Sequence, residues 1–172
     1  MRTFLFFLAV AMPLSGENWT VATPVPYKIA LAMPDSLQPL DPSAVRIEGW
    51  LGARIDANAS SRLEVVDTEP LLAGYIKKPG SQPWIGEHIG KWIHAATLAW
   101  VYTGDRALRE KLDAAVARLI ATQEPDGYLG TYVPSQRFGL YPDADWDVWT
   151  HAYNMIGLLA IRWVACLHSA TI

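Results

Sequence analysis

The sequence predicts an all-α fold built from helical hairpins. Residues 85–103, 105–123 and 146–163 place apolar side chains at three- and four-residue steps, which is the spacing of one helix face. No part of these segments has the alternating pattern of a strand. Helices joined by alternately short and long links are typical of stacked helical hairpins. We therefore expect either a helical bundle or an arc of an α/α toroid, here part of an (α/α)6 ring.

Residues 1–16 have the pattern of an export signal. Arg2 precedes an apolar run over residues 4–12, and Pro13 and Gly16 follow it. The alternative, a buried first helix, is disfavoured because these two residues would interrupt it so soon. No later run is long enough to cross a bilayer, so we expect an exported protein, periplasmic or extracellular, without a membrane anchor.

Residues 17–48 form an irregular lead-in, because five prolines between positions 24 and 42 prevent a long helix. Residues 45–47 (Val-Arg-Ile) could form a short extended piece within it. Residues 51–75 have only a weak helical pattern, which the polar residues near Asn58 interrupt. The main helical domain is expected over residues 49–163.

The three strong helices have recognisable ends. Gly104 is a C-terminal stop for the helix over 85–103, and Asp105 is an N-cap for the next helix. Pro125 is expected to stop that helix near Gln123. The fourth helix runs from about Trp146 to residue 163, with an apolar set comprising Val148, Met155, Ile156, Leu159 and Trp163.

Composition limits the classes of partner. The formal net charge is −3 and the pI is about 5.7, so no basic field attracts a phosphate backbone, and nucleic acid is an unsuitable partner. Eight Trp and seven Tyr among 172 residues suit a neutral ligand instead. Cys166 is the only cysteine, which excludes an internal disulfide framework and a zinc site of several thiolates within these residues.

The loop at residues 123–132 is the first candidate for a ligand contact. Gly127 and Gly130 permit backbone angles closed to other residues, and Tyr128 and Tyr132 supply rigid rings with polar tips. We expect the loop to present these rings at a pocket mouth. The alternative is a structural corner between packed helices.

A polar line on the fourth helix is the best site candidate. Asp147, His151 and Asn154 stand at i, i+4 and i+7 and therefore share one helix face. A carboxylate in the first turn can orient an imidazole one turn later, while Trp146 and Trp149 could stack on a sugar ring. The alternative is a capping aspartate, a histidine satisfied in the core and two core tryptophans.

The helix over 85–103 carries weaker candidates. Trp92, one turn after His88, could face a cavity or belong to the core. Glu87 and Lys91 are interpreted as a surface pair without chemistry, worth about 0.3 kcal/mol. Motifs of zinc proteases, of serine hydrolases and of nucleotide-binding loops are absent from the sequence.

Several segments in order carry a family resemblance: residues 86–96, 102–105, 123–131 and 146–151. Together they resemble the amino-terminal part of the catalytic domain of glycoside hydrolase family 127, the β-L-arabinofuranosidase family. The element Gln-x-x-Asp-Gly-Tyr-Leu at residues 123–129 is the most specific piece. Residues 49–54 also resemble the entry motif of that family, so the likeness extends from about residue 39 to residue 159.

This resemblance implies an (α/α)6 toroid followed by β-sandwich domains, in a retaining exo-glycosidase that removes arabinofuranose units. In such enzymes a zinc-bound cysteine is the nucleophile and a glutamate is the acid/base. Neither group can be matched here, so we expect no catalytic residue and no metal ligand in this chain, and Cys166 is not a carried-over ligand. Zinc is implied only for the full-length family.

The resemblance does align one helix of the family's sugar pocket with Trp146, Asp147, Trp149 and His151. Trp146 stands where some members have His, and Asp147 replaces Glu, which leaves the exact sugar open. The substrate-binding set that we predict is Trp92, Tyr128, Trp146, Asp147, Trp149, His151 and Asn154.

Beyond residue 161 the family pattern stops, and residues 164–172 are interpreted as an atypical tail after a truncation or frame shift. We therefore expect an exported amino-terminal fragment that is inactive alone. Two alternatives stay open: a non-catalytic helical carbohydrate-binding or interaction module, and another α/α-toroid enzyme that degrades polysaccharides.

Overall fold

Every regular element is a helix in residues 44–139 and 146–169, which are the residues that the computed structural model describes. The predicted signal and almost all of the lead-in lie outside this range. The elements in order are α1 (Gly49–Asn58), the π-helix η2 (Ala59–Leu63), α2 (Glu69–Ile76), α3 (Glu87–Thr103), α4 (Arg106–Ile120), the 3-10 turn η3 (Pro134–Gln136) and α5 (Trp146–Ser169). The all-α prediction is confirmed for this part of the chain.

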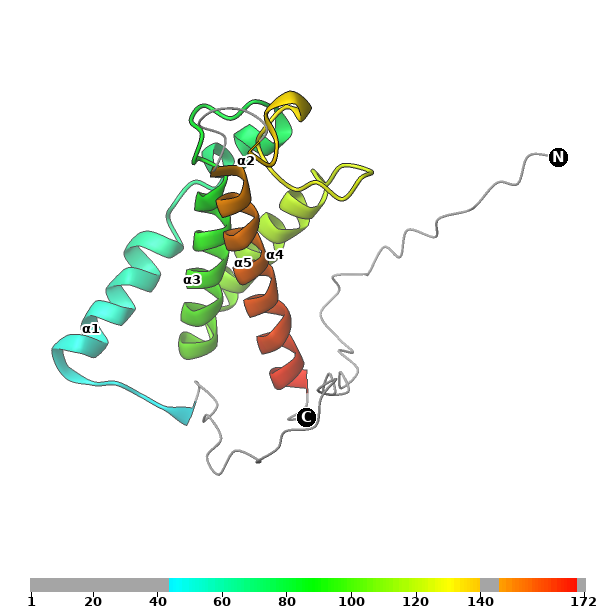
Figure 1. The fold of residues 1–172 in the computed structure, drawn as a ribbon. Coiled ribbons are helices and arrows are strands. Elements are labelled where there is room, and N and C mark those ends of the chain that lie inside the picture. The colour runs from blue at the N-terminus through cyan, green and yellow to red at the C-terminus, as the bar shows by residue number, and fades with distance from the viewer. Residues whose placement is uncertain (1–43, 140–145, 170–172) are drawn as a thin grey trace, which may run out of the picture.

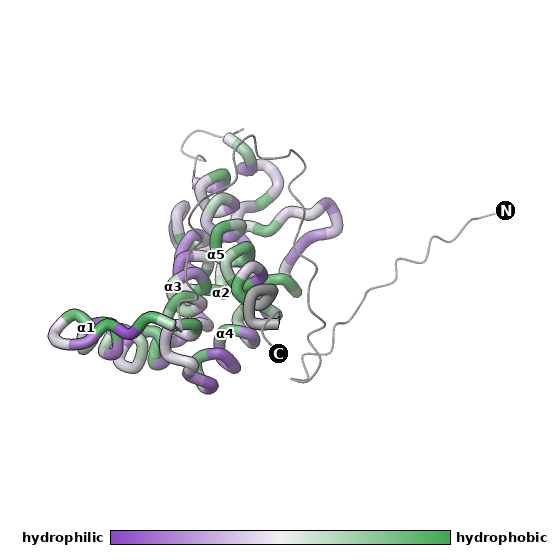
Figure 2. Tube along the Cα trace, turned by 90° about the horizontal axis from the view of Figure 1, so that it is seen from below, coloured by the Kyte–Doolittle hydropathy of each residue, from purple (hydrophilic) through white to green (hydrophobic). Residues whose placement is uncertain are grey.

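The helix α3 packs against both α5 and α4, and α1 extends to one side of this group (Figures 1 and 2). The amino end of α5, the helix α2 and the loop after α4 gather at one end of this group (Figure 1). The largest fully buried apolar side chains come from α2, α3 and α4: Leu72, Tyr75, Ile89, Ile93, Leu108, Leu112 and Leu119. Each buried aliphatic side chain contributes about 2 kcal/mol.

The predicted boundary between α3 and α4 is confirmed. Gly104 adopts the left-handed conformation at φ 70° and ends α3, while the Asp105 carboxylate accepts a hydrogen bond from the Leu108 amide at 2.8 Å. The far end of α4 differs from the prediction, because the helix stops at Ile120 and not near Gln123. Pro125 instead follows Glu124 in a tight turn, closed by a hydrogen bond from the Gly127 amide to the Glu124 carbonyl.

The weak helix predicted over residues 51–75 is divided in the structure. The α1 helix passes into η2 at Ala59, and α2 begins after Thr68 with Pro70 in its first turn. The predicted extended piece at residues 45–47 forms no strand. It lies against the end of α3, where the Ile47 amide donates to the Tyr102 hydroxyl at 3.0 Å.

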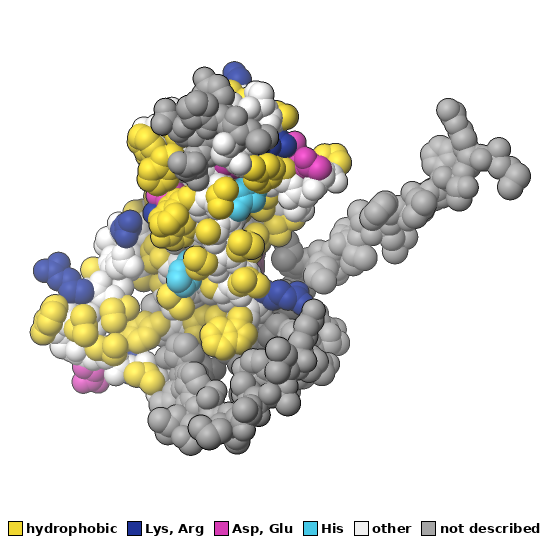
Figure 3. Space-filling model, in the orientation of Figure 1, with side chains coloured by type: hydrophobic (Ala, Val, Ile, Leu, Met, Phe, Trp, Pro, Cys, Tyr) yellow, Lys and Arg dark blue, Asp and Glu magenta, His cyan; other side chains and the backbone are white. Residues whose placement is uncertain are grey.

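The buried face of α5 differs from the apolar face that the sequence indicates. Its buried positions are Asp147, Thr150, Asn154, Gly157 and Val164, whereas the predicted apolar set is exposed to solvent: Val148, Met155, Ile156, Leu159 and Trp163. Figure 3 shows hydrophobic side chains along this outer face of α5. The backbone of α5 continues to Ser169, beyond the predicted end at residue 163.

A close backbone contact between α3 and α5 explains this choice of face. A Cβ atom at Gly90 would lie only 2.5 Å from the Tyr153 carbonyl oxygen, and one at Gly157 would lie 2.6 Å from the Gly90 carbonyl oxygen. The two helices can approach this closely only along a face of glycine and small polar residues. The contact brings the amino end of α3 beside the first two turns of α5, where the candidate site residues lie.

No helix in the described part of the chain is both long enough and apolar enough to cross a membrane.

Candidate functional site

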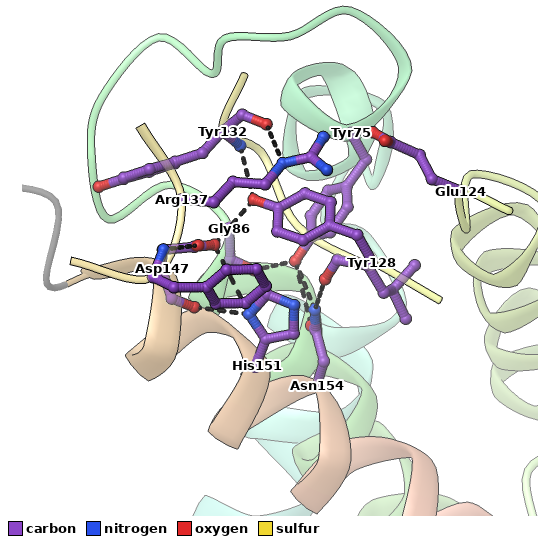
Figure 4. Close-up of polar contacts among 11 residues, drawn as sticks. Tyr75, Gly86, Glu124, Tyr128, Tyr132, Arg137, Asp147, His151 and Asn154 are labelled. Atoms are coloured by element: carbon purple, nitrogen blue, oxygen red, sulfur yellow. Dashed lines mark hydrogen bonds and ion pairs between the residues drawn. The ribbon is translucent and has the colours of Figure 1, made fainter. Parts of the chain in front are cut away.

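A buried carboxylate marks the first turn of α5. Asp147 is 0% exposed, and both of its oxygens accept hydrogen bonds. Oδ1 accepts from the Tyr128 hydroxyl at 2.8 Å, and Oδ2 accepts from the Phe138 amide at 3.0 Å. Figure 4 shows how the loop side chains converge on this point. Because a buried charge is costly without such donors, the Tyr128 hydroxyl, the Phe138 amide and the carboxylate hold one another in place.

Tyr128 is a buried hydrogen-bond donor. Its hydroxyl donates to Asp147 and accepts from the Tyr132 amide at 3.0 Å. Burial, followed by the hydrogen bond to the Asp147 carboxylate, raises the pKa of Tyr128 well above its usual value, so the phenol stays protonated. The loop was expected to present Tyr128 and Tyr132 at a pocket mouth. Both rings are buried and folded toward α5, which is closer to the alternative of a structural corner.

Arg137 packs over the ring of Tyr128, whose hydroxyl is bonded to Asp147. Its guanidinium carbon lies 3.5 Å from the ring centroid, its Nε donates to the Tyr132 carbonyl at 3.2 Å, and one terminal nitrogen donates to Glu124 at 2.7 Å. Lys78 also pairs with Glu124, at 3.1 Å. The hydrogen bond from Arg137, and then that from Lys78, lower the pKa of Glu124. No motif in the sequence indicates this role of Arg137.

Gly130 allows the loop backbone to pass directly over this contact. A Cβ atom there would lie 2.5 Å from the Tyr128 hydroxyl oxygen and 3.0 Å from Asp147 Oδ1. Any side chain at position 130 would therefore collide with the Tyr128 hydroxyl and with the Asp147 oxygen that accepts its hydrogen bond. This close approach gives a physical reason for the second glycine of the loop.

His151 lies at the solvent edge of the network. Its Nδ1 is 2.8 Å from the Asp147 main-chain carbonyl oxygen and 3.6 Å from the carboxylate oxygen Oδ1. Since a carbonyl oxygen only accepts, Nδ1 carries the proton and Nε2 has the lone pair in the neutral ring. The side chain is 26% exposed, and Nε2 makes no hydrogen bond within the described residues. The predicted pairing of Asp147 with His151 thus runs mainly through the main chain.

Phe138 lies beside His151 and was not anticipated from the sequence. Its φ is 56°, the left-handed region that bulky residues rarely adopt, which costs about 1 kcal/mol. Its ring is nevertheless 59% exposed. The ring centroid lies 5.8 Å from that of Tyr128 and 5.9 Å from that of His151. The Phe138 ring and the His151 imidazole therefore form one partly exposed surface.

Asn154, the third residue of the predicted polar line, joins buried elements. Its Nδ2 donates to the Tyr75 hydroxyl at 2.7 Å and to the Leu129 carbonyl at 3.1 Å. Tyr75 in turn donates to the Gly86 carbonyl at 2.7 Å. These bonds tie α2, the start of α3 and the loop to α5 (Figure 4). Asn154 thus holds the loop and α2 against α5 and has a supporting role in the candidate site.

Glu87 contradicts the expectation of a surface pair. The residue is only 7% exposed, and its Oε1 accepts from Lys91 at 2.6 Å. Its Oε2 accepts from the indole N–H of Trp149. The close contact between α3 and α5 buries Glu87, and that contact cannot be seen in the spacing of either helix alone. Glu87 therefore orients Trp149, a role that the sequence reasoning missed.

Trp146 and Trp149 belong to a row of partly exposed rings. Trp146 meets Trp84 at a centroid distance of 5.8 Å and Trp149 at 6.3 Å, and Trp149 meets Tyr153 at 5.2 Å, all edge to face. Lys91 Nζ lies 4.4 Å from the Tyr153 ring centroid. These two tryptophans are outside the core, which contradicts the alternative of two core tryptophans.

Trp92 does not join the other predicted residues. It is buried, and its indole N–H donates to the Leu63 carbonyl of η2 at 3.3 Å. Lys111 of α4 lies 5.9 Å from its ring centroid. Trp92 therefore packs in the core against η2 and α4, as in the alternative interpretation of its position.

The described residues do not offer a donor set for the zinc that the family resemblance implies. No three His, Cys, Asp or Glu side chains within residues 44–139 and 146–164 lie close enough together to hold a metal ion. Asp147 already uses both oxygens, and Glu87 is paired with Lys91.

Comparison with known proteins identifies the family. The family model of the β-L-arabinofuranosidase GH127 catalytic domain matches residues 39–164, most of the chain. No curated protein and no solved structure gives a significant match. The family is one of α/α toroids, in agreement with the predicted fold class and with the helices described above. The chain belongs to glycoside hydrolase family 127 and carries part of its β-L-arabinofuranosidase-like catalytic domain.

Proposed function

We propose that this chain binds the terminal arabinofuranose of a glycan as one wall of the sugar pocket of an exported family 127 glycosidase. The observation that carries the proposal is the presentation of His151 Nε2 at the edge of the buried network of Asp147 and Tyr128. Exposed aromatic rings lie on the same end of α5. Ligand sites in proteins combine a few oriented polar atoms with aromatic surface in this way.

The geometry suits a neutral sugar. Nε2 of His151 is the ring nitrogen that can accept a hydrogen bond from a sugar hydroxyl, because Nδ1 donates to the Asp147 carbonyl. The indoles of Trp146 and Trp149 offer apolar faces to the C–H groups of a sugar ring. Glu87 holds the Trp149 indole in one orientation, so less ordering is required when a ligand binds.

Hydrolysis is proposed to need groups beyond this network. Both Asp147 oxygens accept hydrogen bonds from the protein, which leaves the carboxylate poorly placed as a nucleophile or general acid. Tyr128 remains protonated because its pKa is raised. The matched segment, residues 39–164, does not include Cys166, the single cysteine. We therefore propose that the chain binds a sugar but does not cleave glycosides alone.

Export of the chain is part of the same proposal. Zinc is proposed only for the full-length enzymes of the family and not for this chain. Export is supported by the signal pattern over residues 1–16. Amino-terminal sequencing of the product secreted by an expressing cell checks it, because a processed terminus near residue 11 or 16 is expected. An intact Met1 on intracellular protein would contradict it.

Calorimetric titration of the full chain with an aryl β-L-arabinofuranoside tests the binding proposal. We expect saturable binding that His151→Ala weakens at least about fivefold, the effect of losing one oriented hydrogen bond. His94→Ala, farther along α3, is the matched control and should bind as the wild type does. Equal affinity in all three proteins would contradict the role of His151. Release of the aryl group in the presence of zinc would contradict the lack of cleavage.

A second candidate function is a non-catalytic carbohydrate-binding module. The row of exposed rings that includes Trp146 and Trp149 favours it, since such surfaces bind oligosaccharides without chemistry. Titration with arabinose-containing oligosaccharides, together with light scattering, separates the two. Binding by a stable monomer that His151→Ala leaves unchanged favours the module, whereas binding that His151→Ala weakens favours the sugar pocket of a larger catalytic domain.

A further inference from the structure

The Phe138 side chain combines two unfavourable features. Its backbone has φ 56°, a conformation that a residue with a Cβ atom adopts at a cost, and 59% of its surface is exposed to solvent. A glycine would adopt the same backbone without strain, as the adjacent Gly139 does at φ 72°. Neither backbone energy nor burial in a core therefore accounts for a phenyl ring at this position.

The network holds this strained residue in one position. The Phe138 amide donates to Asp147 Oδ2 at 3.0 Å, and the same carboxylate receives the Tyr128 hydroxyl. The Phe138 ring meets the Tyr128 ring edge to face, with an interplanar angle of 84°. Its centroid lies 5.9 Å from that of His151, whose side chain is 26% exposed and whose Nε2 makes no hydrogen bond within the described residues. These contacts thus hold the apolar Phe138 ring at a fixed separation from the imidazole of His151, whose Nε2 can accept a hydrogen bond.

We propose that Phe138 is a specificity-determining residue that stacks on the apolar face of the bound sugar while His151 Nε2 accepts a hydrogen bond from one of its hydroxyls. This inference rests on the proposed function and names a contact that the family match does not assign. The ligand class is a terminal sugar with a C–H face on one side and a free hydroxyl at its edge. Backbone strain at Phe138 is the cost of placing the ring over that face.

The test uses the full chain and the variants Phe138→Gly and Phe138→Tyr. Phe138→Gly removes both the ring and the strain, so we expect about fivefold weaker binding of an aryl β-L-arabinofuranoside with no fall in the thermal midpoint. Phe138→Tyr keeps the ring and should bind within about twofold of the wild type. The matched control is Trp163→Ala, which removes an aromatic ring that is 64% exposed at a distant turn of α5 and should leave the affinity unchanged.

The outcomes separate this inference from the proposed function. Binding by the wild type that Phe138→Gly leaves unchanged overturns the stacking role alone. A lower thermal midpoint in Phe138→Gly assigns the ring a structural role, and a loss of affinity in Phe138→Tyr as large as that in Phe138→Gly shows that the affinity does not depend on the ring. Either result also overturns the stacking role. Absence of sugar binding by the folded wild type overturns the proposed function and this inference together.

Discussion

Replacement of Asp147 by alanine should destabilise the chain more than any change at an exposed carboxylate. The wild-type side chain is fully buried and accepts from two donors, the Tyr128 hydroxyl at 2.8 Å and the Phe138 amide at 3.0 Å. Alanine leaves both donors without an acceptor in a region closed to solvent. The substitution therefore removes two charge-assisted hydrogen bonds and creates two unsatisfied groups.

The expected magnitude follows from these two donors. Each buried donor left unpaired costs about 1–3 kcal/mol, so Asp147→Ala should lower the free energy of unfolding by roughly 4 kcal/mol. Asp147→Asn keeps one acceptor oxygen and should cost about half as much, roughly 2 kcal/mol. For a domain of this size, 4 kcal/mol corresponds to a fall of roughly 10 °C in the thermal midpoint.

Urea unfolding followed by circular dichroism at neutral pH measures these changes. The matched control is Asp113→Ala, which removes a carboxylate paired with Arg109 one turn away on α4 and should cost less than about 1 kcal/mol. Tyr128→Phe in the Asp147→Ala background should add less than it does in the wild type, because the bond between the two residues is already lost. If Asp147→Ala costs no more than Asp113→Ala, the buried network does not organise this end of the fold.

Two further substitutions test other parts of the structure. Gly90→Ala should lower the free energy of unfolding by about 1–3 kcal/mol, because its Cβ would lie 2.5 Å from the Tyr153 carbonyl oxygen; an unchanged urea midpoint would contradict the close contact between α3 and α5. The pKa of Tyr128 is raised on folding, so the folded chain keeps this proton more tightly, and the unfolding free energy should fall as the pH rises above about 10. Tyr128→Phe should make that alkaline fall shallower, and an identical slope in both proteins would count against the raised pKa.

The sequence predicted α3 and α4 well because their signals are local. The apolar spacing, the glycine at position 104 and the capping carboxylate of Asp105 act within one or two turns, and the structure reproduces all three. The polar line of Asp147, His151 and Asn154 is likewise a property of a single helix, and these residues do share a face.

The predictions for the buried face of α5 and for Glu87 were wrong because contacts between helices determine both features. The spacing of apolar residues misidentified the buried face of α5, because the contact between Gly90 and Gly157 selects a face of small and polar residues. The same contact buries Glu87, which the i, i+4 spacing with Lys91 indicated as a surface residue.

The role of the loop was also set by its surroundings. Tyr128 turns inward because Asp147 and Arg137 lie on either side of it, and nothing in the local sequence specifies those neighbours. Phe138 carries no motif, and its position is evident only from its backbone angle and its exposed ring. Local patterns therefore indicated the helix that bears the candidate site, whereas the position of the loop beside that helix required the structure.

A crystal structure of the full chain with a bound arabinofuranoside would test most directly whether His151 and Phe138 form a sugar site. We expect a sugar hydroxyl within hydrogen-bond distance of His151 Nε2 and the sugar's C–H face against the Phe138 ring, with the Tyr128 hydroxyl still bonded to Asp147. A sugar bound elsewhere on the chain, with the His151 and Phe138 surface left empty, would contradict it.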